Sequence, residues 1–114
     1  MAFYFEDFSV YKDAINFIQE VDVFLESLPP KGNLRLVDQL QRASTSIVLN
    51  IAEGAGRFHK TDKKNYYVIA RGSVYECVAC IQIFMAKKLI DAEKYDAFYR
   101  SLNNLARQLS AMVK

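Results

Sequence analysis

The amino-acid sequence predicts an all-α protein, a single domain over residues 1–114 that folds as an antiparallel up-down-up-down four-helix bundle. Three observations favour this fold class. Apolar side chains recur at intervals of three and four along four long segments, which is the spacing of one helix face. The segments have similar lengths and short connections. Only 4 Gly and 2 Pro occur in 114 residues, too few for the many tight turns of a β-protein.

The first helix is expected near residues 6–28, where two apolar stripes run along one segment. One stripe contains Phe8, Tyr11, Ile15, Ile18 and Leu25, and the other contains Val10, Ala14, Phe17, Val21, Phe24 and Leu28. The sequence Pro29-Pro30-Lys31-Gly32 ends the helix, since proline lacks the backbone donor and the space to continue it. A helix that is apolar on two sides tends to be covered on two sides, so this segment predicts a homo-oligomer.

The second helix is expected near residues 34–55, with Asn33 as its N-cap. Its core stripe contains Leu36, Leu40, Ala43, Ile47 and Ile51. We expect Gly54 or Gly56 to end this helix in a left-handed conformation, because glycine adopts positive φ without steric cost.

The last two helices are expected near residues 62–88 and 91–112. Thr61 or Asp62 is the predicted N-cap of the third and Asp91 that of the fourth. The third has the stripe Tyr66, Ile69, Ser73, Cys77, Cys80 and Phe84, and Lys87 and Lys88 suit its negative C-terminal end. The fourth has the stripe Tyr95, Phe98, Leu102, Leu105, Leu109 and Met112.

The connector GAGRFHKT, residues 54–61, is similar to the phosphate-binding pattern G-x-x-x-x-G-K-[ST], but His59 replaces the last glycine. A true phosphate loop follows a β-strand, whereas the preceding segment here continues a helical stripe. The connector is therefore interpreted as a turn between two helices.

No catalytic or metal site is expected, and no cofactor. Cys77 and Cys80 form C-x-x-C, but His59 is the single histidine and no further cysteine could complete a zinc site. The two cysteines lie in the middle of a predicted helix among apolar residues, so we expect them to be buried and free. No Glu-x-x-His pair of a di-iron bundle is present. The prediction is a non-enzymatic protein, with an acid–base pair of Glu53 and Glu76 as the alternative.

Polar residues interrupt the apolar stripes of the second and third helices. They are Arg42, Ser46, Asn50 and Glu53 on the second, and Ser73 and Glu76, preceded by Gly72, on the third. We expect these side chains to form a buried, hydrogen-bonded network that fixes helix register, with Gly72 and Ser73 permitting close helix approach.

Charge is unevenly distributed although the net charge is only +2. Residues 1–30 carry −5, residues 31–90 carry +6 and residues 91–114 carry +1. The basic side chains that could contact the phosphates of RNA or DNA are Arg57, His59, Lys60, Lys63, Lys64 and Arg71, and Tyr66 and Tyr67 could stack on bases. Two alternatives remain: the basic face binds an acidic protein or the acidic first helix of a neighbouring subunit, or the charges are merely solvated.

The protein is expected in the cytoplasm without a membrane partner. No run of about 18 apolar residues is present, and the first ten residues carry acidic rather than basic side chains.

Two strings carry a family resemblance: QLQRASTSIVLNIAEGAGR, Gln39 to Arg57, and YYVIARGSVYE, Tyr66 to Glu76. They resemble the 23S rRNA intervening-sequence protein family through R-A-x-x-S-I-x-x-N-I-A-E-G and A-x-G-S-x-x-E. The matching positions are Arg42, Ala43, Ser46, Ile47, Asn50, Ile51, Ala52, Glu53 and Gly54, followed by Ala70, Gly72, Ser73 and Glu76.

The resemblance implies an antiparallel four-helix bundle without catalytic activity, and a homopentamer as the favoured assembly. The family is similar to the accessory variability protein of diversity-generating retroelements, a basic pentamer that binds nucleic acid and a reverse transcriptase. It therefore implies RNA or DNA and a reverse transcriptase or another acidic protein as partners. The present sequence differs in its acidic first helix and its low net charge.

Overall fold

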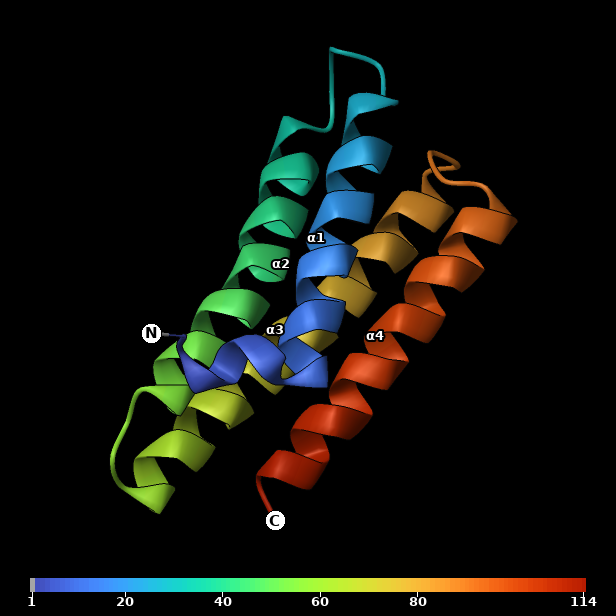
Figure 1. Cartoon of the computed structure of the whole chain (residues 1–114). Helices are drawn as coiled ribbons and strands as arrows, with labels where there is room; N and C mark the ends of the chain where they lie inside the picture. The colour runs from blue at the N-terminus through green and yellow to red at the C-terminus, as the bar shows by residue number, and fades with distance from the viewer. Residues whose placement is uncertain (1) are drawn as a thin grey trace.

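The computed structural model describes residues 2–114 and shows four α-helices preceded by a short 3-10 helix (Figure 1). The elements are η1 (Tyr4–Asp7), α1 (Ser9–Glu26), α2 (Leu34–Ala55), α3 (Lys60–Ala86) and α4 (Ala92–Met112). Consecutive helices run in opposite directions, and no strand occurs between residues 2 and 114. The predicted all-α, up-down-up-down bundle is confirmed. The molecule is elongated, with principal dimensions of 44 × 28 × 22 Å.

The core lies between the inward faces of all four helices. On α1 it uses the second of the two predicted stripes, from Val10 to Phe24, whereas the stripe from Phe8 to Leu25 is only half-buried. Aromatic rings join α1, α3 and α4: the Phe24 ring lies edge-on to Phe84 at 5.3 Å and to Phe98 at 5.6 Å between centroids. Such edge-to-face pairs add stability beyond the apolar area they bury.

The helix ends agree with the sequence predictions in part. Asp91 is the N-cap of α4, and its Oδ1 accepts a hydrogen bond from the Lys94 backbone N–H at 2.7 Å. Asn33 precedes α2 but is left-handed, with φ of 58°, and its side chain accepts from Lys87 Nζ instead of capping the helix. The expectation for α3 was wrong: the helix begins at Lys60, before Thr61 and Asp62, with His59 as an N-cap that makes no side-chain capping bond.

Neither Gly54 nor Gly56 is left-handed, which corrects the sequence prediction for the end of α2. Gly54 lies within the helix, and Gly56 has φ of −80°. Gly54 is needed for space instead, because a Cβ there would lie 2.7 Å from Cε1 of Tyr67 on α3. Gly72 is the opposite case: it is exposed with nothing within 4 Å of its added Cβ, so it does not bring helices together.

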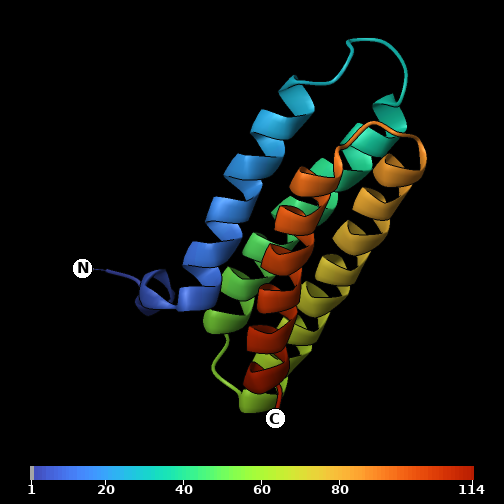
Figure 2. The ribbon, with the colours of Figure 1, turned by 90° about the vertical axis from the view of Figure 1, so that its right-hand side faces the viewer.

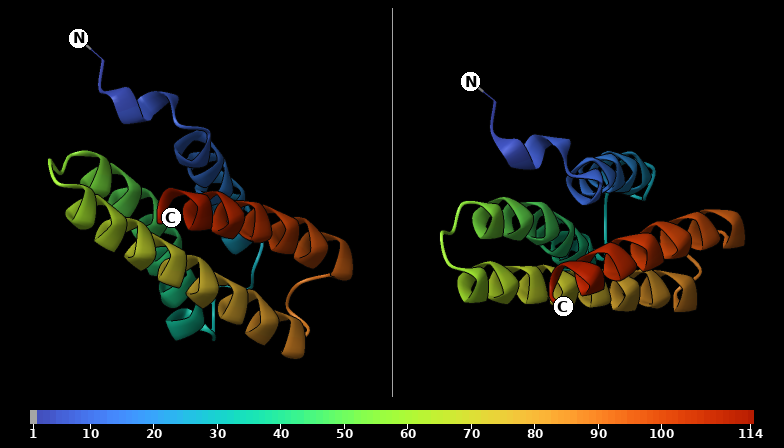
Figure 3. Two further views of the ribbon diagram at one scale, coloured as in Figure 1. Left: turned by 90° about the horizontal axis from the view of Figure 1, so that it is seen from below. Right: turned by 60° about the horizontal axis from the view of Figure 1, so that its bottom comes forward.

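The helix predicted from residue 6 is broken near its start. Phe8 is extended, with ψ of 129°, so residues 2–8 form an N-terminal arm that contains η1. The Tyr4 hydroxyl donates to the Ala55 carbonyl at 2.6 Å, and Lys63 Nζ donates to both of these oxygens at 2.9 Å. Figures 2 and 3 show the arm projecting sideways from the bundle beside the start of α1.

Helix α3 is apolar on its outer face as well as towards the core. Its inward residues in the first half are Tyr67, Ala70 and Val74, one position beyond the predicted stripe, so Ile69 is exposed. Val68 and Ile83 are exposed too. By length and composition alone α3 could cross a membrane, since an 18-residue window has a mean hydropathy of 1.4, but in this bundle α3 packs against α2 and α4.

Candidate interaction surfaces

A small polar cluster joins the middle of α2 to the middle of α3. The hydroxyls of Ser46 and Ser73 are 2.8 Å apart, and Asn50 Nδ2 donates to Ser46 Oγ at 3.0 Å and to the Ser46 carbonyl at 2.9 Å. Ser73 is buried, while Ser46 and Asn50 are half-buried. These hydrogen bonds satisfy polar groups at the interface of the two helices, and misaligned helices would lose them.

The charged members expected in this network lie outside it. The Arg42 side chain is 76% exposed and its Nε is 2.8 Å from Asp38 of its own helix. Glu53 is exposed, 3.6 Å from Arg57, and Glu76 is exposed and accepts from Gln39. The expectation of buried Arg42, Glu53 and Glu76 was therefore wrong. Long charged side chains beside an apolar stripe reach solvent easily, so sequence position alone does not place them.

Glu53 and Glu76 also do not form a carboxylate pair. Glu76 lies beside Gln39, whereas Glu53 lies 14 residues further along α2, about 21 Å at 1.5 Å per residue. Two acids that share one reacting group must lie far closer than this.

Three of the six predicted nucleic-acid contacts are engaged with tyrosines. The Arg57 guanidinium lies 4.7 Å from the ring centroid of Tyr66 and donates to its hydroxyl at 2.6 Å. Lys63 lies over the ring of Tyr4 at 5.5 Å. Arg71 lies 4.6 Å from the ring centroid of Tyr75 and also donates to Ser110 Oγ of α4. These three cations therefore already contact aromatic rings within the bundle and help to stabilise it.

The other three, His59, Lys60 and Lys64, make no side-chain hydrogen bond or ion pair with any residue from 2 to 114. Between them and Arg57 lies Phe58, whose side chain is 97% exposed. We define Arg57, Phe58, His59, Lys60 and Lys64 as the basic tip. It forms the end of the molecule where α2 turns into α3 (Figure 1).

Sequence reasoning missed Phe58 and misplaced the stacking tyrosines. Tyr67 is buried under Gly54 and cannot stack on a base, and Tyr66 is half-buried beneath Arg57. Phe58 could have been found, because it lies on none of the apolar stripes and is flanked by basic residues within a turn.

Cys77 and Cys80 are free and buried, as expected. Burial raises the pKa of the Cys77 thiol strongly, and the neighbouring Cys80 and Glu76 add to this effect. Burial, followed by the charge of Glu76, also raises the pKa of Cys80. Both groups are thus neutral thiols near pH 7, a poor state for nucleophilic or metal-binding chemistry. Among residues 2–114 no three His, Cys, Asp or Glu side chains gather in a way that could hold a metal ion.

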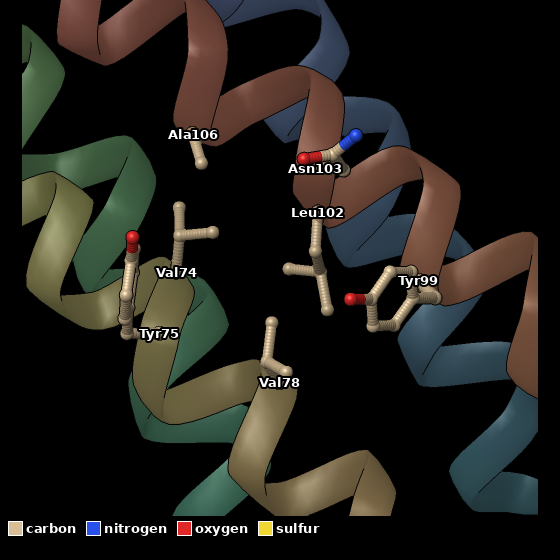
Figure 4. Close-up of a pocket in the computed structure, with 7 residues that line it drawn as sticks. All are labelled: Val74, Tyr75, Val78, Tyr99, Leu102, Asn103 and Ala106. Carbon is tan, nitrogen blue, oxygen red and sulfur yellow. The ribbon is translucent and has the colours of Figure 1, made fainter.

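A groove opens between α3 and α4 (Figure 4). Val74 and Val78 of α3 and Leu102 and Ala106 of α4 form its floor, and Tyr75 and Tyr99 stand on either side, with Asn103 on the α4 edge. The groove has a volume of about 230 Å³ and is lined mainly by apolar atoms. We call it the α3–α4 groove.

The arrangement of helices and the two strings quoted above point to one family. The family model described as 23S rRNA-intervening sequence protein matches residues 6–111, nearly the whole chain. The chain belongs to the 23S rRNA-intervening sequence protein family. The family resemblance predicted from the α2 and α3 motifs is confirmed.

A solved structure is similar to this member of the 23S rRNA-intervening sequence protein family in fold. It is the crystal structure of a protein of unknown function from the S23 ribosomal protein family of Bacteroides thetaiotaomicron VPI-5482, at 1.70 Å resolution. The TM-score is 0.84 at 20% sequence identity, over 92% of this chain and 98% of that chain. At this identity the likeness concerns the fold alone. No curated protein matches the chain.

Proposed function

We propose that this protein is a non-enzymatic, self-associating bundle of the cytoplasm that binds RNA or DNA through its basic tip, without sequence preference. The observation that carries the proposal is Phe58, an aromatic ring 97% exposed that lies between Arg57 and Lys60 in the sequence, at the same end of the bundle as Lys64. An exposed phenylalanine gains nothing from solvent, and basic side chains at the start of α3 oppose the helix dipole, so neither feature stabilises the isolated chain.

The chemistry of the tip suits single strands. Lys60, Lys64 and His59 can neutralise backbone phosphates, and the Phe58 ring can stack on an unpaired base, which has a π-face whatever its identity. One tip offers few contacts and therefore weak binding. Self-association repeats the tip, so that contacts along one strand add through multivalency.

Support for self-association comes from surface that the bundle leaves exposed. Val68, Ile69 and Ile83 lie on the outer face of α3, and the α1 stripe from Phe8 to Leu25 is only half-buried. Exposed apolar surface of this kind usually contacts a partner. The pentameric state and a reverse-transcriptase partner remain predictions from family resemblance.

The proposal is tested by electrophoretic mobility shift of single-stranded RNA and DNA at about 50 and 200 mM salt. We expect a shift at the lower salt that is largely lost at the higher, and its loss at both in Lys60→Glu/Lys64→Glu. The matched control is Lys31→Glu/Lys88→Glu, the same charge change on exposed residues at the opposite end of the bundle, which should bind as the wild type does.

Phe58→Ala separates stacking from charge. It should weaken binding to single strands by roughly tenfold, since one base–aromatic stack is worth about 1–3 kcal/mol, and leave the salt dependence unchanged. The proposal is wrong if the wild type gives no shift at low salt or if the Lys60/Lys64 variant binds normally.

The second candidate is an interaction scaffold with no nucleic-acid role, favoured by the apolar α3–α4 groove. Light scattering that shows an oligomer, together with no mobility shift, would establish this alternative over the first.

A further inference from the structure

The α3–α4 groove has a positive rim around its apolar floor. Arg71 lies one helical turn before Val74 and Tyr75, and Arg100 and Arg107 lie one turn before and after Asn103 on α4. Asp96, one turn before Tyr99, is the nearby acid on α4, while Glu76 is turned towards Gln39 of α2. The rim is thus net positive, and a ligand that fits it combines aromatic or aliphatic groups with negative charge.

The N-terminal arm has the complementary chemistry. Phe3 is 70% exposed and Tyr4 is also exposed, and the acids Glu6 and Asp7 follow directly. The outer face of α1 is acidic too, but Val23 is its one large exposed apolar side chain, so it fits an apolar groove less well. The arm thus places two exposed aromatic rings and two carboxylates within five consecutive residues, Phe3 to Asp7.

We propose that the N-terminal arm of one copy of this chain docks in the α3–α4 groove of a second copy. Phe3 enters between Tyr75 and Tyr99, and Glu6 and Asp7 face Arg100 and Arg107. The inference rests on the self-association in the proposed function and names the two surfaces that meet.

The groove has room for the ring. An apolar cavity of about 150 Å³ holds benzene, and the α3–α4 groove measures about 230 Å³. The arm cannot fill the groove of its own chain from its present position, because it packs against α1, α2 and the Lys63 side chain at the start of α3, and projects away from the bundle (Figure 3). A second copy is the occupant that supplies both shape and charge.

Arm and groove are different surfaces, so the contact joins copies head to tail. Such a contact closes into a ring, or into a dimer if two arms exchange reciprocally. Each subunit then gives one arm and receives one.

The first test is site-specific crosslinking between two variants of different size. Ala2→Cys, which keeps the Phe3 ring, is mixed with a tagged Asn103→Cys and treated with a short bifunctional maleimide. The natural cysteines are buried and burial raises their pKa values, so we expect them to react slowly. We expect a mixed-size product from this pair, and none when Asn103→Cys is replaced by Asp22→Cys on the exposed acidic face of α1.

The second test is a charge exchange followed by light scattering. Asp7→Lys alone and Arg107→Glu alone should each weaken self-association by roughly tenfold or more, because like charges then meet at the contact. The combined variant should recover the mass of the wild type. Asp22→Lys, an equal charge change outside the proposed contact, should leave the mass unchanged.

The outcomes separate this inference from the proposed function. If the wild type is an oligomer, the absence of a mixed-size product from Ala2→Cys with Asn103→Cys, or unchanged association of Asp7→Lys and Arg107→Glu, overturns the arm–groove contact alone. A monomeric wild type overturns self-association and the contact together. Nucleic-acid binding is measured by mobility shift and stands or falls separately.

Discussion

Gly54 is a residue whose purpose depends on a neighbour distant in sequence. It lies inside α2, where glycine costs about 0.5–1 kcal/mol relative to alanine. The buried Tyr67 ring of α3 occupies the space that a side chain would need, and Cβ of Tyr66 lies 3.1 Å from the added Cβ position. The lost helix propensity is the cost of close α2–α3 packing.

Gly54→Ala should lower the free energy of unfolding by about 1–3 kcal/mol, because overpacking against a buried ring outweighs the gain in helix propensity. Gly72→Ala is the matched control on α3: with open space around it, alanine should raise stability by about 0.5–1 kcal/mol. Urea unfolding followed by circular dichroism measures both. Equal effects of the two substitutions would show that the Tyr67 contact is unimportant.

The basic residues show what single positions in a sequence reveal and what they conceal. Charge is visible in the sequence, so Arg57, Lys63 and Arg71 are natural candidates for phosphate contacts. The contacts of these side chains with tyrosines cannot be seen in the sequence. Tyr4, for example, is 59 residues from Lys63 along the chain. Phe58 was overlooked for the converse reason, because an aromatic residue in a sequence suggests a core position.

At the scale of elements, helix bounds were predictable where apolar spacing and end signals coincide. The sequence predicts residues 34–55 for the second helix, and α2 is Leu34–Ala55. The start of α3 was missed because Lys60 follows a residue with no capping side chain. The break at Phe8 was missed because the aromatic spacing continues through it into the arm.

Lys88 is left-handed although lysine rarely is, and here the Leu89 N–H bond to the Phe84 carbonyl closes the end of α3.

The two helix starts with known geometry give a prediction at this scale. Asp91→Ala should cost about 0.5–2 kcal/mol, because the Lys94 N–H loses its acceptor at the start of α4. Asn33→Gly should change stability by less than about 0.5 kcal/mol, since glycine accepts the left-handed conformation and only an exposed bond to Lys87 is lost. Thermal unfolding of both variants decides this, and a neutral Asp91→Ala would contradict the capping role.

For the whole molecule, the fold and family followed from the sequence more completely than the surfaces did. The spacing of apolar and polar residues along a segment defines which face of a helix is apolar, and four such faces can pack together into one bundle. They do not determine which of two α1 stripes faces inward, nor whether Arg42, Glu53 and Glu76 bend away to solvent. Those outcomes depend on packing between helices.

The buried cysteines report on the integrity of the whole bundle. Cys77 and Cys80 should react with a thiol-specific chromogenic disulfide at about pH 7.5 only as fast as the bundle opens, because both thiols are shielded and kept neutral by burial. In guanidinium the reaction should be complete at once, and Asp22→Cys, on the exposed face of α1, provides a rapidly reacting native control. Fast labelling of the native wild type would show that the core of α3 is open to solvent.

Lys63 contacts the N-terminal arm and lies beside the basic tip, and this links the two surfaces thermodynamically. Its amine holds the arm through Tyr4 and the end of α2 through Ala55, and it lies one turn after His59 at the start of α3. The amine donates to two oxygens and has a third N–H, so a phosphate that draws it towards the basic tip competes with its hydrogen bond to Tyr4. If a bound polyanion changes the equilibrium constant for packing of the arm by some factor, packing of the arm changes the affinity for the polyanion by the same factor. The proposed assembly and the proposed nucleic-acid binding would then be linked by one coupling free energy, which depends on the Lys63 side chain.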